Sequence, residues 1–354
     1  MKPKITFVCG ATLGHIFPAL NIASKISFGT QLQFIVSKNS KFLFFFHSFD
    51  KVFISAKPLY FRKDFLIRLF LFLKSFFEAY FILIKPRPDL LISFGSYVSF
   101  PVVLIAKILN IPIIIHEQNL KVGIANKILF YICDYFAISF KETKELLPAV
   151  NKVIYSGMLT RPDLKKYSRE EAARFFNFDP SRFTVLVMGG SQGSHRINNI
   201  FLESLSKLNL DNLQIIHLSG QKDYDSLNRR YLNYRCKIYL LKFLENISLA
   251  YSMADLIIAR SGAMTLAELA FFHKASILIP YPWASAHQIE NAKLFKNNGL
   301  LCSIIDEKML TAEKLSITIS KLQLEYKDNR LEELFDFNAS DNLIEKIYSL
   351  VKKQ

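Results

Sequence analysis

Asp255-Leu-Ile-Ile-Ala259, followed by Arg260-Ser-Gly-Ala263 and Met264-Thr-Leu-Ala-Glu268, is the stretch that decides the fold. An apolar run typical of a buried strand breaks at a glycine turn, and a helical pattern follows. A helix that begins directly after such a turn directs backbone N–H groups and its positive dipole end at one point, which favours an anion. The carboxylate of Glu268, one turn into the helix, suits the vicinal hydroxyls of a ribose. The pattern suggests a nucleotide site, although similar turns occur throughout α/β proteins.

The composition narrows the class of partner. The chain has 354 residues, enough for two domains with separate cores, and a net charge of +15, which points to nucleic acid, an anionic membrane surface or a phosphorylated substrate. It contains no recognised nucleic-acid module and no ribbon of interleaved aromatic and basic residues, so no nucleic-acid partner is expected. The four cysteines lie far apart and form no CxxC pair, which argues against structural zinc and disulfides and favours a reducing compartment.

Targeting and membrane-spanning segments are not expected. The N-terminal residues lead directly into the strand pattern Ile5–Cys9, without the architecture of a signal peptide. No window offers about 18 consecutive uncharged apolar residues, the length that a spanning helix needs. We therefore expect a cytoplasmic protein that can still bind a membrane surface.

Strand and helix patterns alternate along the chain, which predicts an α/β protein with two parallel sheets, each covered by helices on both faces. In the first half the predicted strands are Ile5–Cys9, Leu32–Val36, Val52–Ser55, Leu90–Phe94, Pro112–His116, Tyr135–Ser139 and Val153–Ser156. In the second half they are Thr184–Met188, Leu213–Leu218, Lys237–Leu241, Asp255–Ala259, Ser276–Pro280 and Leu301–Ile305. The polar segment Gly157–Ser168 is the best candidate for a linker. The first helix is expected to open near Pro18, and the last two at Ala312–Leu322 and Leu331–Lys352.

The segment Asp64–Lys85 is predicted to be a helix with an unusually wide apolar surface. Its polar residues fall within an arc of about 120°, so about 240° is apolar, roughly twice what packing on one sheet requires. The helix therefore either rests on anionic lipid, helped by neighbouring basic residues, or is buried on two sides. We favour the membrane contact and expect it to involve Phe65, Leu69, Phe72 and Phe76.

A second glycine turn, Gly189-Gly-Ser-Gln-Gly-Ser194, follows the first strand of the second half. Its glycines allow the backbone to close around a phosphate, Ser191 adds a hydroxyl donor, and a helix beginning near Arg196 supplies its dipole. An ordinary strand–helix turn rarely needs three glycines in five residues, so phosphate binding is favoured over a purely structural turn. The turn matches neither a Walker A loop nor the GxGxxG fingerprint of dinucleotide-binding enzymes.

Three polar clusters end three predicted strands of the first half: Gly10–His15, Gly95–Tyr97 and His116–Asn119. The carboxyl ends of parallel strands meet at one edge, where ligands of open α/β sheets bind, so we expect a shared site. A neutral imidazole at His15 could act as a base on a hydroxyl, although a lone histidine is more often a helix-capping or packing residue.

No metal site is assigned. Asp223 and Asp225 have the spacing of a metal–diphosphate motif, but acidic residues at the start of a helix explain them adequately. His47, His217 and His273 lie in apolar runs and are expected to be core or surface residues.

Four motifs occur in one order: His116-Glu-Gln-Asn119, Gly189-Gly-Ser-Gln-Gly193, Arg260-Ser-Gly-Ala-Met-Thr-Leu-Ala-Glu268 and His287-Gln288-x-x-Asn291-Ala. Together they resemble the MurG family of peptidoglycan N-acetylglucosaminyltransferases, from Ile5 to about Gly299. The resemblance implies a GT-B fold, in which two Rossmann-like parallel-sheet domains face a cleft and C-terminal helices return to the first domain. It implies an acceptor-binding, membrane-associating domain at 1–160, a domain that binds UDP-N-acetylglucosamine at 161–335, and a returning helix at 336–354.

The implied reaction is inverting transfer of N-acetylglucosamine from UDP-N-acetylglucosamine to the 4-hydroxyl of the muramyl sugar in lipid I, a pentapeptide-bearing undecaprenyl diphosphate. The product is lipid II, and no cofactor or metal is required. The implied location is the cytoplasmic face of the bacterial inner membrane, where the enzyme is peripheral. Cell-wall synthesis or division proteins are further candidate partners.

Expected roles follow from the matching motifs. His15 is the candidate base, and Glu117 is the second catalytic residue. The turn at Gly189–Ser194 would hold the diphosphate, and Glu268 the ribose. The residues expected to bind the donor are Thr12, Gly14, Asn119, Arg161, Gly190, Ser191, Gln192, Gly193, Leu244, Arg260, Ala263, Met264, Thr265, Glu268, Gln288 and Asn291. Those expected to bind the acceptor are Gly10, Tyr97 and His116.

The first domain departs from the family in its loops. Gly-Gly-Thr-Gly-Gly-His is here Gly10-Ala-Thr-Leu-Gly-His15, Gly-Gly-Tyr-Val-Ser-Gly-Pro is Gly95-Ser-Tyr-Val-Ser-Phe-Pro101, and Gly-Asn-Pro-Val-Arg is Gly157-Met-Leu-Thr-Arg161. The motifs expected to bind the donor match the family, whereas the loops expected to bind the acceptor differ from it. Two alternatives therefore stay open: a related lipid glycosyltransferase with another acceptor, such as diacylglycerol, and a nucleotide-binding membrane adaptor without catalysis.

Overall fold

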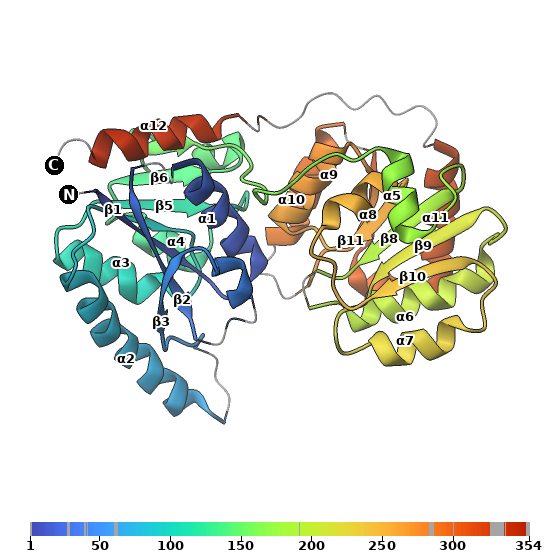
Figure 1. Cartoon of the computed structure of the whole chain (residues 1–354), viewed down its shortest axis with the longest axis horizontal. Coiled ribbons are helices and arrows are strands. Elements are labelled where there is room, and N and C mark those ends of the chain that lie inside the picture. Colours follow the sequence, from blue (N-terminus) through green and yellow to red (C-terminus); the bar gives the residue numbers. More distant parts are fainter. Residues whose placement is uncertain are drawn as a thin grey trace. The chain divides into compact units, whose positions relative to one another are not determined.

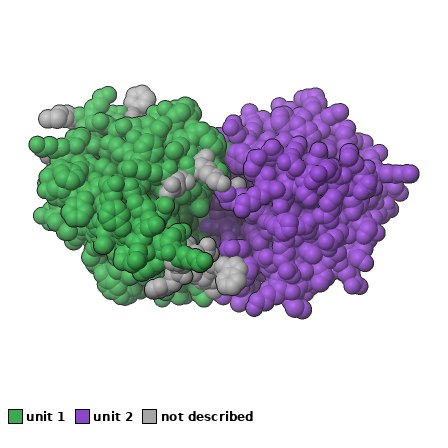
Figure 2. All heavy atoms as spheres, turned by 90° about the horizontal axis from the view of Figure 1, so that it is seen from below, with its two compact units in different colours: residues 1–162, 336–354 green, residues 163–335 purple. Residues whose placement is uncertain are grey.

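The computed structural model describes residues 2–26, 29–38, 40, 42–59, 63–190, 192–282, 287–299, 301–325, 336 and 338–351. The chain divides into two compact units: unit 1 comprises residues 1–162 and 336–354, and unit 2 comprises residues 163–335 (Figure 2). The chain thus leaves unit 1 once and returns to it at its C-terminal end.

Unit 1 is built on a parallel sheet with the strand order β3-β2-β1-β4-β5-β6-β7 (Figure 1). Its strands are β1 (Lys4–Cys9), β2 (Gln31–Ser37), β3 (Asp50–Ile54), β4 (Leu90–Ser93), β5 (Ile113–Glu117), β6 (Tyr135–Ile138) and β7 (Val153–Tyr155). Its helices are α1 (Leu13–Ile26), η1 (Leu43–Phe46), α2 (Phe65–Ile84), α3 (Ser99–Ile108), α4 (Ile124–Leu129), η2 (Lys141–Leu146) and α12 (Ser340–Val351).

Unit 2 repeats this plan with the order β10-β9-β8-β11-β12-β13, again with every pairing parallel. Its strands are β8 (Phe183–Met188), β9 (Leu213–Leu218), β10 (Lys237–Leu241), β11 (Leu256–Ala259), β12 (Ala275–Leu278) and β13 (Cys302–Ile304). Its helices are α5 (Arg169–Phe176), α6 (His195–Ser204), η3 (Leu205–Lys207), α7 (Tyr224–Tyr231), α8 (Ile247–Met253), α9 (Ala263–Phe272), α10 (His287–Asn297), η4 (Glu307–Met309) and α11 (Ala312–Glu325).

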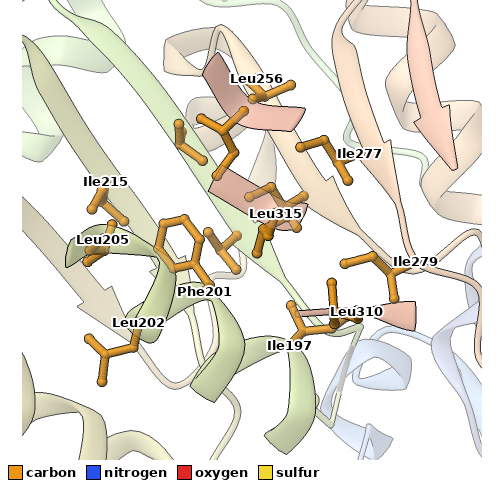
Figure 3. Packing of buried hydrophobic residues seen from close by; sticks show 14 of the residues in the cluster. Ile197, Phe201, Leu202, Leu205, Ile215, Leu256, Ile277, Ile279, Leu310 and Leu315 are labelled. Atoms are coloured by element: carbon orange, nitrogen blue, oxygen red, sulfur yellow. The ribbon is translucent and has the colours of Figure 1, made fainter. Parts of the chain in front are cut away.

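All the predicted strands are confirmed, to within two residues at either end. The inner strands of a parallel sheet are buried on both faces, so their sequences read as continuous apolar runs. In unit 2, for example, Phe201 of α6 and Leu315 of α11 pack over Ile215, Leu256 and Ile277 of the sheet (Figure 3). The positions of the strands therefore follow from the burial of their side chains, and an apolar run in the sequence indicates that burial directly.

Two helix starts differ from expectation. Helix α1 begins at Leu13 rather than near Pro18, which lies inside it and leaves one backbone carbonyl without its usual N–H donor. Helix α12 begins at Ser340, whereas the expected helix began at Leu331 and ended at Lys352; residues 331–335, 337 and 352 lie outside the described part. The carboxylate of Asp336 accepts hydrogen bonds from the backbone N–H groups of Asn338 (2.9 Å) and Ala339 (3.1 Å), which holds this segment in a turn.

Helix α12 belongs to unit 1, where it packs on β7 and α1. The turn before it lies directly against Gly157, because a Cβ at Gly157 would overlap the carbonyl oxygen of Asp336. The chain thus re-enters unit 1 beside Gly157, shortly before Pro162, the last residue before it leaves the unit.

Helix α2 confirms the predicted helix and shows which of its residues are exposed. Two of its polar side chains face the protein: Ser75 is buried, and the Glu78 carboxylate accepts hydrogen bonds from the N–H (2.6 Å) and hydroxyl (2.7 Å) of Ser55. Phe65, Leu69, Phe72 and Phe76, the expected membrane contacts, are only partly exposed, and Phe72 packs against Phe100 of α3. The exposed apolar residues of the helix are Leu66, Ile67, Phe70, Leu73, Phe77, Tyr80, Phe81 and Ile84.

Candidate active site

Both sheets reverse their strand order at one point, and the predicted sites lie there. In unit 1 the reversal falls between β1 and β4, and in unit 2 between β8 and β11. Open α/β sheets bind ligands at the carboxyl ends of the strands that flank such a reversal. The loops after these four strands are Gly10–Thr12, Gly95–Val98, Gly189–Ser194 and Arg260–Gly262.

The turn Gly189–Ser194 in unit 2 needs glycine for two reasons. Gly193 has φ +75°, and a Cβ there would overlap the carbonyl oxygen of Ser219 in the loop after β9. Gly190 and Gln192, both expected to bind the donor, are exposed. Ser191, the expected hydroxyl donor, lies outside the described residues. Helix α6 begins at His195, directly after the turn, so its N-terminal N–H groups lie at the end of this loop.

We predict that Gly193→Ala destabilises the protein by about 2 kcal/mol, because the backbone would hold a side chain in the left-handed region and against Ser219. Gly262→Ala is the matched control: Gly262 has φ −65°, and a Cβ added there would meet no atom within 4 Å. The control should cost less than about 1 kcal/mol, the range for an alanine at a helix N-cap. Thermal unfolding of both variants measures the difference, and equal shifts would contradict this account of the turn.

Arg260 holds the glycine turn from one side. Its guanidinium is nearly buried and donates to the hydroxyl of Ser194 (2.8 Å) and to the carbonyl oxygens of Ile279 (3.1 Å) and Pro280 (3.3 Å). It also forms an ion pair with Glu307, whose side chain is only 14% exposed. Arg260 therefore ties the loop after β11 to the glycine turn, and Glu307 compensates the charge of Arg260.

Asn198 of α6 holds the other side of the turn. It is fully buried, and its amide donates to the carbonyl oxygen of Ser219 and to the carboxylate of Asp223, both at 2.8 Å. The other oxygen of Asp223 pairs with His195 at 2.8 Å. The Asp223 carboxylate is thus part of the support of this turn. Among the described residues, no group of three or more His, Cys, Asp and Glu side chains is arranged to hold a metal.

His217 lies in the core, as expected. It is fully buried in β9, and its two ring nitrogens contact the hydroxyl of Tyr231 (2.5 Å) and the side-chain oxygen of Asn198 (3.0 Å). Burial lowers the pKa of His217 to about 3, so the ring is neutral at physiological pH. It therefore supports Asn198 without adding a charge.

Glu268 lies on α9 as the sequence pattern predicts. It is 8% exposed, and one carboxylate oxygen accepts a hydrogen bond from the hydroxyl of Tyr251 at 2.8 Å. Helix α9 begins at Ala263, so Met264 and Thr265 lie in its first turn, with Gly262 at the N-cap. The strand, turn and helix predicted for Asp255–Glu268 are therefore confirmed. The carboxylate of Glu268 lies on the same helix as the N-terminus that follows the turn.

Helix α10 is tied to the same loop. The hydroxyl of Ser261 donates to the carbonyl oxygen of Gln288 (2.8 Å), whose side chain accepts from the N–H of Tyr281 (2.9 Å). Asn291 is fully buried, and Leu244 is partly exposed in the loop after β10. The structure thus brings Gln288 beside the Arg260–Ala263 loop, as expected of one site.

In unit 1 two of the three polar clusters, Gly10–His15 and Gly95–Tyr97, are in contact. A Cβ at Gly10 would lie 2.6 Å from the Cβ of Ser96 and 3.1 Å from the Nδ1 atom of His15, so the loops after β1 and β4 touch. Ser96 has φ +79°, a conformation that glycine adopts without strain and serine does not. Ser96 stands where the family motif has glycine, the residue that adopts this conformation most readily. The predicted shared edge is confirmed, although Tyr97 packs largely against the core.

His15 has the properties of a neutral base. Its Nδ1 atom lies 2.8 Å from the hydroxyl of Thr12, and burial lowers the pKa of His15 to about 4. His116 is fully buried; burial first, and the charge of neighbouring His15 second, lower the pKa of His116 to about 3. At neutral pH both rings are therefore uncharged. His116, expected to contact the acceptor, instead lies 3.2 Å from the hydroxyl of Ser139 inside the domain.

Glu117, the second expected catalytic residue, organises the loop after β5. One carboxylate oxygen accepts from the backbone (2.9 Å) and side-chain (3.0 Å) N–H groups of Asn119, and the other from Gly123 N–H (2.9 Å) and the Asn126 amide (2.9 Å). Four donors fill the acceptor capacity of a carboxylate. The geometry therefore gives Glu117 a positioning role.

Arg161 lies in unit 1. Its guanidinium stacks on the ring of Phe17 at 4.7 Å, and the preceding carbonyl, of Thr160, accepts a hydrogen bond from Asn21 (2.8 Å). Both contacts are with α1, the helix that carries His15. Gly14, in the first turn of α1, has open space around it.

Sequence reasoning missed Tyr251, Glu307 and Asn198. Asn198 carried a usable signal, because it lies between apolar residues on the buried side of a predicted helix, where an amide requires partners. Glu307 and Tyr251 carried none, since each contacts a residue far along the chain.

Comparison with known proteins adds the family. The model of the glycosyltransferase family 28 N-terminal domain matches residues 5–138, and that of the C-terminal domain matches residues 184–347. The chain is 37% identical to a Thermodesulfovibrio yellowstonii protein named UDP-N-acetylglucosamine--N-acetylmuramyl-(pentapeptide) pyrophosphoryl-undecaprenol N-acetylglucosamine transferase, over 90% of this chain and 89% of that one. It is 34% identical to a protein of the same name from Protochlamydia amoebophila, over 92% and 88%.

Solved structures agree with this relationship. The crystal structure of Acinetobacter baumannii MurG matches with a TM-score of 0.73 and 27% identity, covering 100% of both chains. A Methanocaldococcus jannaschii UDP-GlcNAc 2-epimerase, at 16% identity and a TM-score of 0.66, covers 98% of this chain and 99% of its own and shares the fold alone. The expected GT-B fold is confirmed, and the chain belongs to glycosyltransferase family 28 as a MurG-type glycosyltransferase.

Proposed function

We propose that this enzyme transfers N-acetylglucosamine from UDP-N-acetylglucosamine to the 4-hydroxyl of the muramyl sugar of lipid I, giving lipid II. One observation carries the donor side: the glycine turn Gly189–Ser194 and the carboxylate of Glu268 lie after β8 and β11, the two strands at the reversal point of one sheet. Backbone N–H groups suit a diphosphate, and a carboxylate suits ribose hydroxyls. The names of the relatives support the acceptor.

In the proposed reaction, the acceptor hydroxyl attacks the anomeric carbon of the donor sugar. The new C–O bond forms on the face opposite the leaving group, the bond to the diphosphate breaks, and UDP departs with that electron pair. His15 takes the proton of the attacking hydroxyl. The amides of the glycine turn and the N-terminus of α6 stabilise the charge that develops on the diphosphate.

Labelled UDP-N-acetylglucosamine incubated with the full-length chain and lipid I tests this function, with a diacylglycerol acceptor in parallel. Label is expected in the lipid I product alone. Label in the diacylglycerol fraction alone would replace the proposal with the related lipid glycosyltransferase. Absence of transfer to both would leave only the role of nucleotide-binding adaptor.

We also propose that the enzyme works peripherally at the cytoplasmic face of the inner membrane, with α2 as its contact. None of the described helices combines the length and apolar character needed to cross a bilayer. The arrangement of α2 supports a peripheral contact, because Phe70, Phe77 and Phe81 are exposed while the polar Ser75 and Glu78 face the protein. Lys63, Lys74 and Lys85 add positive charge for anionic lipid.

The membrane contact predicts that replacing Phe70, Phe77 and Phe81 by serine weakens binding to vesicles by tenfold or more. Each phenylalanine ring is worth about 1.5–3 kcal/mol when removed from water. The control variant replaces Ile317 and Leu324, which are exposed on α11 of unit 2, by serine. Cosedimentation with vesicles of phosphatidylglycerol and phosphatidylcholine measures both. Equal binding of the two variants would exclude α2 as the contact.

A further inference from the structure

Tyr251 is the largest side chain that is fully buried in the described part of the chain, and it contacts the ribose-binding carboxylate of the proposed function. It lies on α8, and its ring stacks on Phe272 of α9 with centroids 5.1 Å apart and planes 7° apart. Its hydroxyl donates to Oε2 of Glu268 at 2.8 Å. The same hydroxyl lies 3.9 Å from the sulfur of Met188, the last residue of β8. Tyr251 therefore links the ribose carboxylate to the strand that leads into the diphosphate turn.

The hydrogen bond matters because Glu268 is almost completely removed from water. A buried carboxylate is costly unless polar groups replace its hydration, and a phenol O–H is a strong donor for that purpose. A free glutamate side chain also has three rotatable bonds, and its rotamer freedom would have to be lost when a ligand binds. Tyr251 removes part of this freedom before the ligand arrives.

We infer that Tyr251 is a positioning residue for the donor's ribose: its hydroxyl fixes the carboxylate of Glu268 so that this group reads the pentose hydroxyls of a ribonucleoside diphosphate. The inference rests on the proposed role of Glu268. Tyr251 itself is buried and acts through Glu268. Its effect should therefore be seen in the ratio of the affinities for ribose and deoxyribose ligands. A carboxylate that is held in place binds the ribose hydroxyl more strongly, and the deoxy ligand lacks that hydroxyl.

Tyr251→Phe tests the inference with the loss of a single oxygen, since the ring and its stack on Phe272 are kept. The affinities of UDP and of 2′-deoxy-UDP and 3′-deoxy-UDP are measured by calorimetry on the full-length chain. In the wild type, UDP should bind more tightly than at least one deoxy ligand. Tyr251→Phe should weaken UDP binding by about fivefold to tenfold, within the range for the loss of one hydrogen bond, with less effect on that deoxy ligand. The ratio of the two affinities should therefore fall.

The ratio separates positioning from folding, because partial unfolding lowers both affinities of one variant equally. Phe272→Leu disturbs the ring stack and spares the hydroxyl, so it should keep the wild-type ratio. Glu268→Gln should reduce the ratio more than Tyr251→Phe does. If Tyr251→Phe keeps the wild-type ratio while Glu268→Gln reduces it, the inference about Tyr251 is wrong and the ribose assignment of Glu268 stands. An unchanged ratio in Glu268→Gln would overturn the ribose assignment and the inference with it.

Discussion

Replacing His15 by alanine is expected to lower kcat by about 10²- to 10⁴-fold, the range that a positioned general base contributes. The affinity for UDP should change little, because the proposed contacts to its diphosphate and ribose, Gly189–Ser194 and Glu268, belong to unit 2. The expected loss of kcat follows from the protonation state of the imidazole. Burial lowers the pKa of His15 to about 4, so the ring is neutral and able to accept a proton at pH 7. When Nδ1–H donates to the hydroxyl of Thr12, Nε2 becomes the proton acceptor. Steady-state kinetics with lipid I and UDP-N-acetylglucosamine measure the effect.

The pH profile gives an independent check. Since only the neutral ring accepts a proton, kcat/KM should stay level near neutrality and fall as the pH drops toward about 4, the pKa of His15. His47→Ala is a matched control, because His47 is an exposed histidine directly after the 3₁₀ helix η1. It should leave kcat unchanged. Full activity of the His15→Ala variant would exclude His15 as the base.

Glu307→Gln is expected to destabilise unit 2 by about 3 kcal/mol, because it removes one partner of a nearly buried ion pair and leaves the charge of Arg260 uncompensated. Glutamine has almost the same shape as glutamate, so the loss reports the charge. The variant should also bind UDP more weakly, since Arg260 holds Ser194 at the diphosphate turn. Calorimetric unfolding measures the stability, and the transition that UDP shifts to higher temperature identifies unit 2.

Glu325→Gln provides the comparison for Glu307→Gln. It removes the same charge from the pair between Lys321 and Glu325, whose side chains are 67% and 43% exposed. Exposed pairs of this kind contribute at most about 1 kcal/mol, so this variant should unfold close to the wild type. Similar unfolding temperatures for the two variants would show that the Arg260–Glu307 pair does not hold the loop.

The fold could be predicted because a parallel sheet buries both of its faces. The predicted strands Leu213–Leu218 and Lys237–Leu241 match the structure to the residue, since each is an apolar run between polar turns. Helix starts depend on local hydrogen bonds instead, and these are weaker signals in the sequence. The carboxylate of Asp336 accepts hydrogen bonds from two backbone N–H groups in the turn before α12. The periodicity of apolar residues does not indicate such a turn.

The site could be predicted where one motif carries both the turn and the side chain. Arg260, Ala263 and Glu268 lie on one strand–turn–helix segment, so their relation follows from spacing. The supports of these residues come from distant segments: Glu307 pairs with Arg260, and Tyr251 lies on the preceding helix. Helix α2 shows a second limit. The width of its apolar surface indicates an exposed face, but width does not say which residues face the protein, and the four expected membrane contacts are only partly exposed.

The chain leaves unit 1 at Pro162, shortly after Gly157, and returns to it at Asp336, which lies beside Gly157, and this has a practical consequence for dissecting the enzyme. Unit 2 is topologically an insert, so it can be excised and the gap bridged by a few glycines, with helix α12 retained. The resulting fragment keeps His15, His116 and helix α2 and lacks Gly189–Ser194 and Glu268. Such a fragment would test, by titration and crystallisation, whether unit 1 alone binds the proposed acceptor.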